Sequence, residues 1–429
     1  MERLVSLRGQ GSRTLFVIAL ACVLGVISAA PALGAPGQLD ATFGGDGRVV
    51  TNLTDGFDSA KGVAIQPDGK IVAVGLAGEF GRFGLARYKP NGRLDAGFGD
   101  GGTVMTNFTG RVDMARAVAI QPDGKIVVAG FAGDQAKFAL ARYNSDGTLD
   151  PTFGGDGKVI TNITLGVDIA YGVTIQSDGK IVAAGSAHEG SGDGRFALAR
   201  YNDDGTLDST FGGDGTVITD FTPQIDLALA LAIQANGKIV AAGEAGKGVS
   251  GSFALARYLP HGRLDSAFGG DGRVTTNLTG GDDFANAVAI QANGKIVAAG
   301  TGGYTKFALV RYELHGSLDP TFAGNGVAMT DFTGRDDIAH GVAIQANGKI
   351  VAAGSAREGY GDSKFALARY RTSGRLDGTF GGDGRVMTDF TGSGDYAHAV
   401  AIQPDGKIVA AGEAAVRGGT FALVRYLDA

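Results

Sequence analysis

Histidine is scarce in this sequence, with five residues in 429, and two of the five occupy the same place in a repeating pattern. His340 and His398 each follow an alanine and precede a small residue and a Val-Ala step. The other copies of the pattern carry at this place Lys61, Arg116, Tyr171, Leu229 and Asn286. Two histidines beside a lysine and an arginine are suited to bind an anion or another polar ligand, and two imidazoles supply two ligands of a metal ion. The alternative is a solvated rim on which residues vary without a function.

A second set of candidate residues lies in segments whose length differs between copies. Between the glycine that ends one strand-like run and the phenylalanine of the next, the copies have 7, 7, 10, 9, 6, 10 and 8 residues. The segment 186–195 contains His188 and Glu189, and the segment 355–364 contains Arg357, Glu358 and Tyr360. Because loops on a rigid scaffold commonly carry binding residues, we expect these segments to be binding loops.

An array of internal repeats must position these candidates. The pair Leu-Asp begins at position 39 and recurs at intervals of 55, 55, 58, 57, 54 and 58 residues, and 53 residues follow its last copy. A period of this length is typical of repeat architectures in which each copy forms one supersecondary unit. We therefore predict one domain over residues 36–429.

Each repeat contains four strand-like runs rich in Val, Ile, Phe and Tyr, with Gly, Asp and Pro between them. In the first repeat the runs span 48–52, 62–66, 70–75 and 83–88, and we name them strands D, A, B and C. Pro67-Asp68-Gly69 joins strands A and B, and an Asp-Gly or Asn-Gly pair stands there in every copy. Such a pair supplies the positive φ of a tight hairpin.

Four antiparallel strands in each of seven repeats predict an all-β fold, a seven-bladed β-propeller. The two ends of the chain are complementary. The chain begins with a lone D strand at 48–52 and ends with A, B and C strands at 397–403, 407–412 and 421–427. Pairing the N-terminal D strand with these three closes the ring and removes both open edges.

Two charged residues recur in every copy of the repeat. Asp58 and its counterparts precede strand A, and Arg87 and its counterparts lie late in strand C. A feature present in every blade is expected to hold blades together rather than to form one active site. We expect each arginine to bond an aspartate or backbone carbonyl oxygens of its own or a neighbouring blade.

Three linked strings carry a family resemblance. They are Leu-Asp-x-x-Phe-Gly-Gly-Asp-Gly at 149–157, Val-Ala-Ile-Gln-x-Asp-Gly-Lys-Ile-Val at 118–127 and Phe-Ala-Leu-Ala-Arg-Tyr at 138–143. The sequence resembles the bacterial delta-60 repeat family over nearly all of the chain behind its N-terminal segment. The resemblance implies a propeller-type repeat in exported bacterial proteins, and it implies no catalytic residue.

The N-terminal segment has the pattern of a secretory signal peptide. Arg3, Arg8 and Arg13 form a basic region before an apolar run over 15–27, and small residues follow this run. Cleavage after Gly34 or Ala35 makes 1–35 the leader, and the product is then secreted, extracellular or held in the cell envelope. An uncleaved N-terminal anchor is the alternative. The formal net charge of −6 argues against nucleic acid as a partner, and we expect no membrane contact after cleavage.

Three functions are compatible with these features. The first is a monomeric, non-catalytic binding scaffold without metal or cofactor. Its variable loops and the mouth of its central channel, where we expect His340, His398 and their counterparts at the entry to strand A, bind a polar ligand, a glycan, a protein surface or a surface polymer. The second is a hydrolase or lyase in which His340 and His398 hold a metal or act as acid and base. Against it, we expect no Asp or Glu partner at the channel mouth beyond those that recur in each blade. The third is a structural spacer of the cell envelope. The lack of a catalytic set favours the first.

Overall fold

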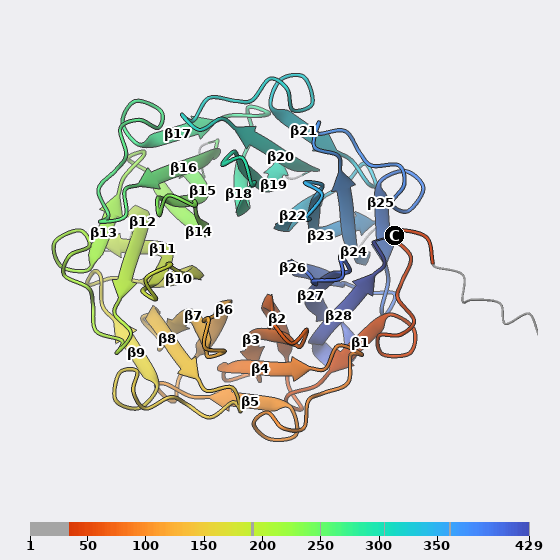
Figure 1. The fold of residues 1–429 in the computed structure, drawn as a ribbon, viewed down its shortest axis with the longest axis horizontal. Helices are drawn as coiled ribbons and strands as arrows, with labels where there is room; N and C mark the ends of the chain where they lie inside the picture. The colour runs from red at the N-terminus through yellow and green to blue at the C-terminus, as the bar shows by residue number, and fades with distance from the viewer. Residues whose placement is uncertain (1–33, 190–192, 249, 304, 360–361, 429) are drawn as a thin grey trace, which may run out of the picture. The chain divides into compact units, whose positions relative to one another are not determined.

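Seven four-stranded antiparallel sheets follow one another along the chain and surround a common centre (Figure 1). The computed structural model describes residues 34–189, 193–248, 250–303, 305–359 and 362–428. The predicted leader lies outside these residues except for Gly34 and Ala35. Within the described ranges, no helix is long and apolar enough to cross a membrane. The prediction of a seven-bladed propeller is confirmed.

Strands A, B, C and D of each blade follow in this order from the centre outwards. Blade 1 consists of β2 (Asp58–Ile65), β3 (Ile71–Ala77), β4 (Arg82–Tyr88) and β5 (Thr103–Thr106). Blade 2 consists of β6 (Asp113–Ile120), β7 (Ile126–Ala132), β8 (Lys137–Tyr143) and β9 (Lys158–Thr161). Blade 3 consists of β10 (Asp168–Ile175), β11 (Ile181–Glu189), β12 (Asp193–Tyr201) and β13 (Thr216–Thr219).

The remaining blades repeat the pattern. Blade 4 consists of β14 (Ile225–Ile233), β15 (Ile239–Lys247), β16 (Ser252–Tyr258) and β17 (Arg273–Thr276). Blade 5 consists of β18 (Asp283–Ile290), β19 (Ile296–Gly302), β20 (Lys306–Tyr312) and β21 (Val327–Thr330). Blade 6 consists of β22 (Asp337–Ile344), β23 (Ile350–Glu358), β24 (Asp362–Tyr370) and β25 (Arg385–Thr388). Blade 7 consists of β26 (Tyr396–Ile402), β27 (Ile408–Ala414), β28 (Thr420–Tyr426) and β1 (Arg48–Thr51), with a 3-10 turn, η1 (Val416–Gly418), before β28.

Blade 7 contains both ends of the chain, as the complementary ends predict. Its strand order is β1-β28-β27-β26, with Arg48 opposite Val424 and Thr51 opposite Phe421. Figure 1 shows β1 and β28 side by side although they lie at opposite ends of the sequence. The ring is therefore closed by three C-terminal strands and one N-terminal strand.

Strand A is longer than the sequence predicts, and its predicted start at residue 62 is wrong. In blade 1 the strand begins at Asp58, because Asp58, Ser59 and Ala60 still pair with strand B. Their polar and small side chains do not have the composition of a strand, so composition alone could not place its start. The hairpin between A and B is as predicted, with Gly69 at φ +81°.

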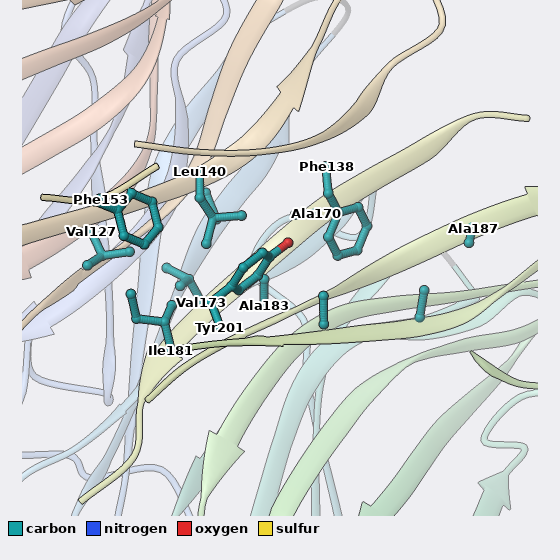
Figure 2. Packing of buried hydrophobic residues seen from close by; sticks show 13 residues of the cluster. Val127, Phe138, Leu140, Phe153, Ala170, Val173, Ile181, Ala183, Ala187 and Tyr201 are labelled. Atoms are coloured by element: carbon teal, nitrogen blue, oxygen red, sulfur yellow. The ribbon is translucent and has the colours of Figure 1, made fainter. Parts of the chain in front are cut away.

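The hydrophobic core is divided into layers between neighbouring blades. In one layer, Val127 and Leu140 of blade 2 pack against Ile181 and Tyr201 of blade 3 (Figure 2). Each of these side chains is fully buried. Because every blade buries both of its faces in this way, each depends on its two neighbours for stability.

A buried hydroxyl pair joins each blade to the one before it. Tyr201, the last residue of β12, donates a hydrogen bond of 2.8 Å to Oγ1 of Thr161, the last residue of β9. The same tyrosine–threonine contact occurs in all seven interfaces, as Tyr88–Thr51, Tyr143–Thr106, Tyr201–Thr161, Tyr258–Thr219, Tyr312–Thr276, Tyr370–Thr330 and Tyr426–Thr388. Burial raises the pKa of these phenols well above their usual range, so they remain protonated.

The recurring aspartate and arginine hold the scaffold, as expected. Asp58 is buried and accepts hydrogen bonds from the backbone N–H groups of Leu53, Thr54 and Gly78, which fixes the connection before strand A. Arg87 Nε donates to Asp95 Oδ2 at 3.0 Å, and its Nη1 donates to the carbonyl oxygen of Ser145 in the next blade. The partner of the arginine is thus the aspartate of the Leu-Asp pair.

Candidate functional site

Strand A carries one extra residue in every blade. In blade 1, Ala60 lies opposite Gly75 and Gly62 lies opposite Val74, so Lys61 has no partner on strand B. Such a β-bulge bends the strand locally and turns the unpaired side chain in a new direction. The seven bulge residues are Lys61, Arg116, Tyr171, Leu229, Asn286, His340 and His398.

A glycine in strand B makes the bulge possible. A Cβ atom on Gly75 would overlap the carbonyl oxygen of Ser59, which lies just before Ala60. The same close approach to strand A occurs at Gly75, Gly130, Gly185, Gly243, Gly300, Gly354 and Gly412. A side chain at this position would force strands A and B apart. The bulge of strand A therefore depends on the glycine of strand B.

All seven bulge residues line one cavity of about 350 Å³ at the centre of the ring. The structure therefore brings together the six polar or aromatic candidates at this position, namely Lys61, Arg116, Tyr171, Asn286, His340 and His398. The expected position at the channel mouth is wrong. Lys61 is the fourth of the eight residues of β2, so the bulge residues lie halfway along strand A, inside the channel.

Lys61 and His398 form a cluster with a third residue, Glu413. Lys61 Nζ lies 2.8 Å from His398 Nε2 and 3.3 Å from Glu413 Oε2, and His398 Nε2 lies 3.6 Å from Glu413 Oε2. The ammonium group therefore donates to the imidazole and to the carboxylate. The His340 ring lies next to this cluster, with its centroid 5.3 Å from that of His398.

Burial and charge set the protonation states of the cluster. Burial lowers the pKa of His340 to about 3 and also lowers the pKa of His398, so both imidazoles are neutral near pH 7. Burial lowers the pKa of Lys61, and Glu413 offsets part of this effect. Burial would raise the pKa of Glu413, but the contacts with His398 and Lys61 outweigh it and lower that pKa to about 2. The cluster and the adjacent His340 thus contain one cation, one anion and two neutral bases.

Glu413 corrects the expectation that the channel offers no carboxylate partner. It directly follows the strand B glycine of blade 7, and the strand register places that position next to the bulge. The other blades carry there Leu76, Phe131, Ser186, Glu244, Thr301 and Ser355. Variation directly after an invariant glycine is the signal that could have identified Glu413, which contacts two bulge residues without itself lining the cavity.

The bulge residues of blades 2 and 3, next to Lys61 in the ring, form an aromatic–cation contact. The guanidinium carbon of Arg116 lies 5.2 Å from the ring centre of Tyr171 and 5.9 Å from that of Phe131. Asn286 Nδ2 donates to the carbonyl oxygen of Ala339 at 2.8 Å, which fixes the amide and leaves its Oδ1 as an acceptor. Phe131 was not predicted either, and it occupies the same position as Glu413 in its own blade.

The residues predicted as binding loops do not line the channel cavity. His188 and Glu189 belong to β11 and pair with β12, and Arg357 and Glu358 belong to β23 and pair with β24. The prediction of loops is wrong here because the two hairpins extend beyond the core of their blades. Glu189 contacts Arg195 at 3.3 Å, Arg357 contacts Asp336 at 3.0 Å, and Glu358 contacts Lys364. Tyr360 lies outside the described residues.

A metal centre needs at least three suitable side chains in one place. Over the described part of the chain, no group of three or more His, Cys, Asp and Glu side chains has such an arrangement. In the channel, Nε2 of His398 faces the ammonium group of Lys61 at 2.8 Å.

Known structures share this architecture at low sequence identity. Virginiamycin B lyase from Staphylococcus aureus superimposes with a TM-score of 0.53 and 10% identity, over 89% of this chain and 98% of that one. A catalytically inactive variant of the same lyase with quinupristin gives a TM-score of 0.53 and 10% identity, over 88% and 98%. Polysaccharide lyase Uly1 gives a TM-score of 0.45 and 12% identity, over 86% and 90%. At 10% identity, the likeness to the two virginiamycin B lyase structures shows the fold alone.

Sequence comparison identifies the family. Curated protein sequences give no match. The family described as "Domain of unknown function (DUF5122) beta-propeller" matches seven times, at residues 66–98, 121–153, 176–211, 234–268, 291–322, 345–380 and 403–427. Each match starts at the end of strand A and includes strands B and C of one blade. Together the matches cover more than half of the chain, which therefore belongs to the DUF5122 β-propeller family.

Proposed function

We propose that the protein is an exported, non-catalytic binding propeller that takes a small polar ligand in its channel. One observation carries the proposal: blades of nearly identical scaffold differ at the bulge residue, and all seven bulge residues line the same cavity. The cavity volume of about 350 Å³ lies in the lower part of the range of roughly 300–1,000 Å³ that is typical of small-molecule sites. A few polar groups with different chemistry at its wall provide orientation and selectivity.

The proposal extends to the location and the partners of the protein. The signal-peptide pattern of residues 1–35 supports export to the medium or the cell envelope, and the strings shared with delta-60 repeats support the same location. We infer a monomer that binds neither nucleic acid nor membrane. The polar hairpin ends at His188, Glu189, Arg357 and Glu358 are proposed as a second, outer contact with a surface polymer or a protein.

A binding screen with a blocked channel tests the proposal. Leu229→Trp fills the cavity from one bulge position, and Leu165→Trp places the same side chain at a site that is 93% exposed and outside the cavity. Soluble glycans and small polar metabolites are screened by calorimetry against the wild type and both variants. We expect a ligand that binds the wild type and Leu165→Trp and fails to bind Leu229→Trp. Equal binding to all three proteins contradicts a channel site, and no ligand at all favours a structural spacer.

A second candidate function rests on the cluster of Lys61, His398 and Glu413. A neutral imidazole next to a lysine and a carboxylate has the composition of an acid–base group, as a propeller hydrolase or lyase requires. The two functions differ in the fate of the ligand. Recovery of an unchanged ligand after long incubation supports binding, whereas conversion that His398→Gln abolishes supports the enzyme.

A further inference from the structure

Arg116 is the bulge residue whose charge is not compensated. Lys61, in the preceding blade, has the carboxylate of Glu413 at 3.3 Å. Within the described residues Arg116 makes neither a hydrogen bond nor an ion pair, and its Nε atom is buried without a partner. Its contacts are the rings of Tyr171 and Phe131. The Nε–H group has therefore lost water without gaining an acceptor, which is costly unless a ligand supplies one.

The two aromatic rings determine how Arg116 can bind an acceptor. A guanidinium group that packs against a ring uses its flat face for this contact, and its N–H donors lie along the edge. Because the side chain also lines the cavity, these donors are available to a ligand inside it. Two parallel N–H groups match the two oxygens of a carboxylate.

The charge of the channel favours a single negative charge on the ligand. Arg116 and Lys61 are cations, Glu413 is an anion, and the two histidines are neutral because burial lowers their pKa values. These groups leave one net positive charge. A monocarboxylate neutralises it, whereas a doubly charged phosphate leaves one negative charge in the cavity.

The bulge residues across the ring from Arg116 offer hydrogen bonds without charge. Arg116 belongs to blade 2, and the opposite blades 5 and 6 contribute Asn286 and His340. Asn286 Oδ1 is an acceptor, and a neutral imidazole has one donor and one acceptor. Hydroxyl groups, which both donate and accept, fit these two residues.

We infer that the channel binds a hydroxylated monocarboxylate of the sugar-acid class, with the carboxylate on Arg116 and hydroxyl groups on Asn286 and His340. The inference rests on the proposed function and deepens it by naming the chemical class of the ligand. It assigns the recognition of the anion to Arg116 rather than to Lys61, because Lys61 already has a counter-charge.

Calorimetry with matched probes tests this assignment. Glucuronate, glucose and glucose 6-phosphate differ only at the group on one carbon, and each is titrated into the purified protein. We expect glucuronate to bind most tightly. Arg116→Gln should weaken glucuronate binding by about 10- to 100-fold, the effect of losing charge-assisted hydrogen bonds. Arg93→Gln makes the same change at an exposed arginine in a turn outside the cavity and should bind like the wild type.

Any other result overturns this inference about the ligand class. The proposed function is tested separately by the Leu229→Trp variant. Glucose or glucose 6-phosphate binding at least as tightly as glucuronate excludes the carboxylate class, and so does a lack of binding by all three probes. Wild-type affinity in Arg116→Gln excludes Arg116 as the anion site. If Arg116→Gln does not fold, Arg116→Lys decides, with an expected loss of about 2- to 10-fold, since it keeps the charge but not the paired donors. A probe that loses binding in Leu229→Trp alone supports the channel site even where the carboxylate is refuted.

Discussion

Lys61 and His398 meet across the interface between the first and the last blade, with Nζ of the lysine 2.8 Å from Nε2 of the histidine. The two residues lie 337 positions apart in the sequence, on β2 and β26. Blade 7 is complete only when β1 pairs with β28, and only then is it fixed next to blade 1. This part of the candidate site therefore exists only in the closed ring.

Glu413→Gln tests the charge balance of the cluster. The variant keeps the shape of the side chain but removes the counter-charge of Lys61, so we expect the free energy of unfolding at pH 7 to fall by about 1–3 kcal/mol. The pKa of His398 should fall further, because Glu413 is a group that raises it. Urea unfolding and an NMR titration of the imidazole measure the two effects. Glu79→Gln, at an exposed carboxylate, is the control, and an unchanged pKa of His398 contradicts the contact.

The lowered pKa of His340 predicts how the free energy of unfolding changes as the pH falls. Burial lowers its pKa to about 3 in the folded protein, whereas a histidine of the unfolded chain titrates near about 6.5. Between these values the unfolded chain binds more protons, so stability decreases as the pH falls, by up to about 1.4 kcal/mol per pH unit. We expect His340→Gln to lose less stability than the wild type between about pH 7 and pH 4. Urea unfolding over this range measures it, with His315→Gln as the exposed control; parallel curves refute the prediction.

The raised pKa of Glu244 predicts that stability decreases as the pH rises, the opposite of the dependence at His340. Glu244 is 3% exposed, its Oε1 has no hydrogen-bond partner among the described residues, and burial raises its pKa to about 7. Here the folded protein binds more protons than the unfolded chain, so stability decreases as the pH rises from about 4.5 to 7. Glu244→Gln, which has no charge to bury, should be more stable than the wild type at about pH 8, by about 1–3 kcal/mol. Thermal unfolding at about pH 5 and pH 8 checks this, since the gain should be present only at the higher pH.

The sequence predicts the architecture because every repeat contains the same strand and turn patterns. The Leu-Asp period gives the blade count, the turn around Gly69 gives the hairpin between strands A and B, and the unequal ends of the chain give the closure. The comparison of copies also identifies the bulge residues, since a varying residue between constant alanines and glycines is visible without any structure.

The remaining features depend on contacts between strands. The bulge at Lys61 follows from the close approach of Gly75 to Ser59, and only the register of strands A and B shows it. Glu413 joins the site because that register, together with ring closure, places it beside His398 and Lys61. The sequence pattern indicates which residues form strands, but it does not show how far a hairpin such as β11–β12 extends. For this reason the sequence predicts a loop at His188, where the structure has a strand.

Arg257→Ala tests the bonds that hold the blades. Arg257 Nε donates to Asp265 Oδ2 at 2.7 Å, and its Nη1 donates to the carbonyl oxygen of Leu314 in the next blade. Removal of this buried partner should cost about 3 kcal/mol, because Asp265 stays buried with less compensation. Lys238 contacts the same carboxylate at 2.8 Å but is 24% exposed, so Lys238→Ala should cost less than about 1 kcal/mol. Urea unfolding measures the free energy of unfolding of both variants. Equal losses of stability would contradict the prediction that the more buried residue contributes more.

Ring closure is tested by removing its last strand and supplying it again. A chain that ends at Gly419 lacks β28, so β1 has no partner and β27 has an open edge. Because each blade relies on its neighbours, we expect this chain to lose the single cooperative unfolding transition in circular dichroism. A synthetic peptide of residues 420–428 should restore the transition. The same peptide with Leu423→Asp should not restore it, because Leu423 is fully buried in the layer between blades 7 and 1. A truncated chain that unfolds like the wild type without any peptide contradicts the requirement for closure.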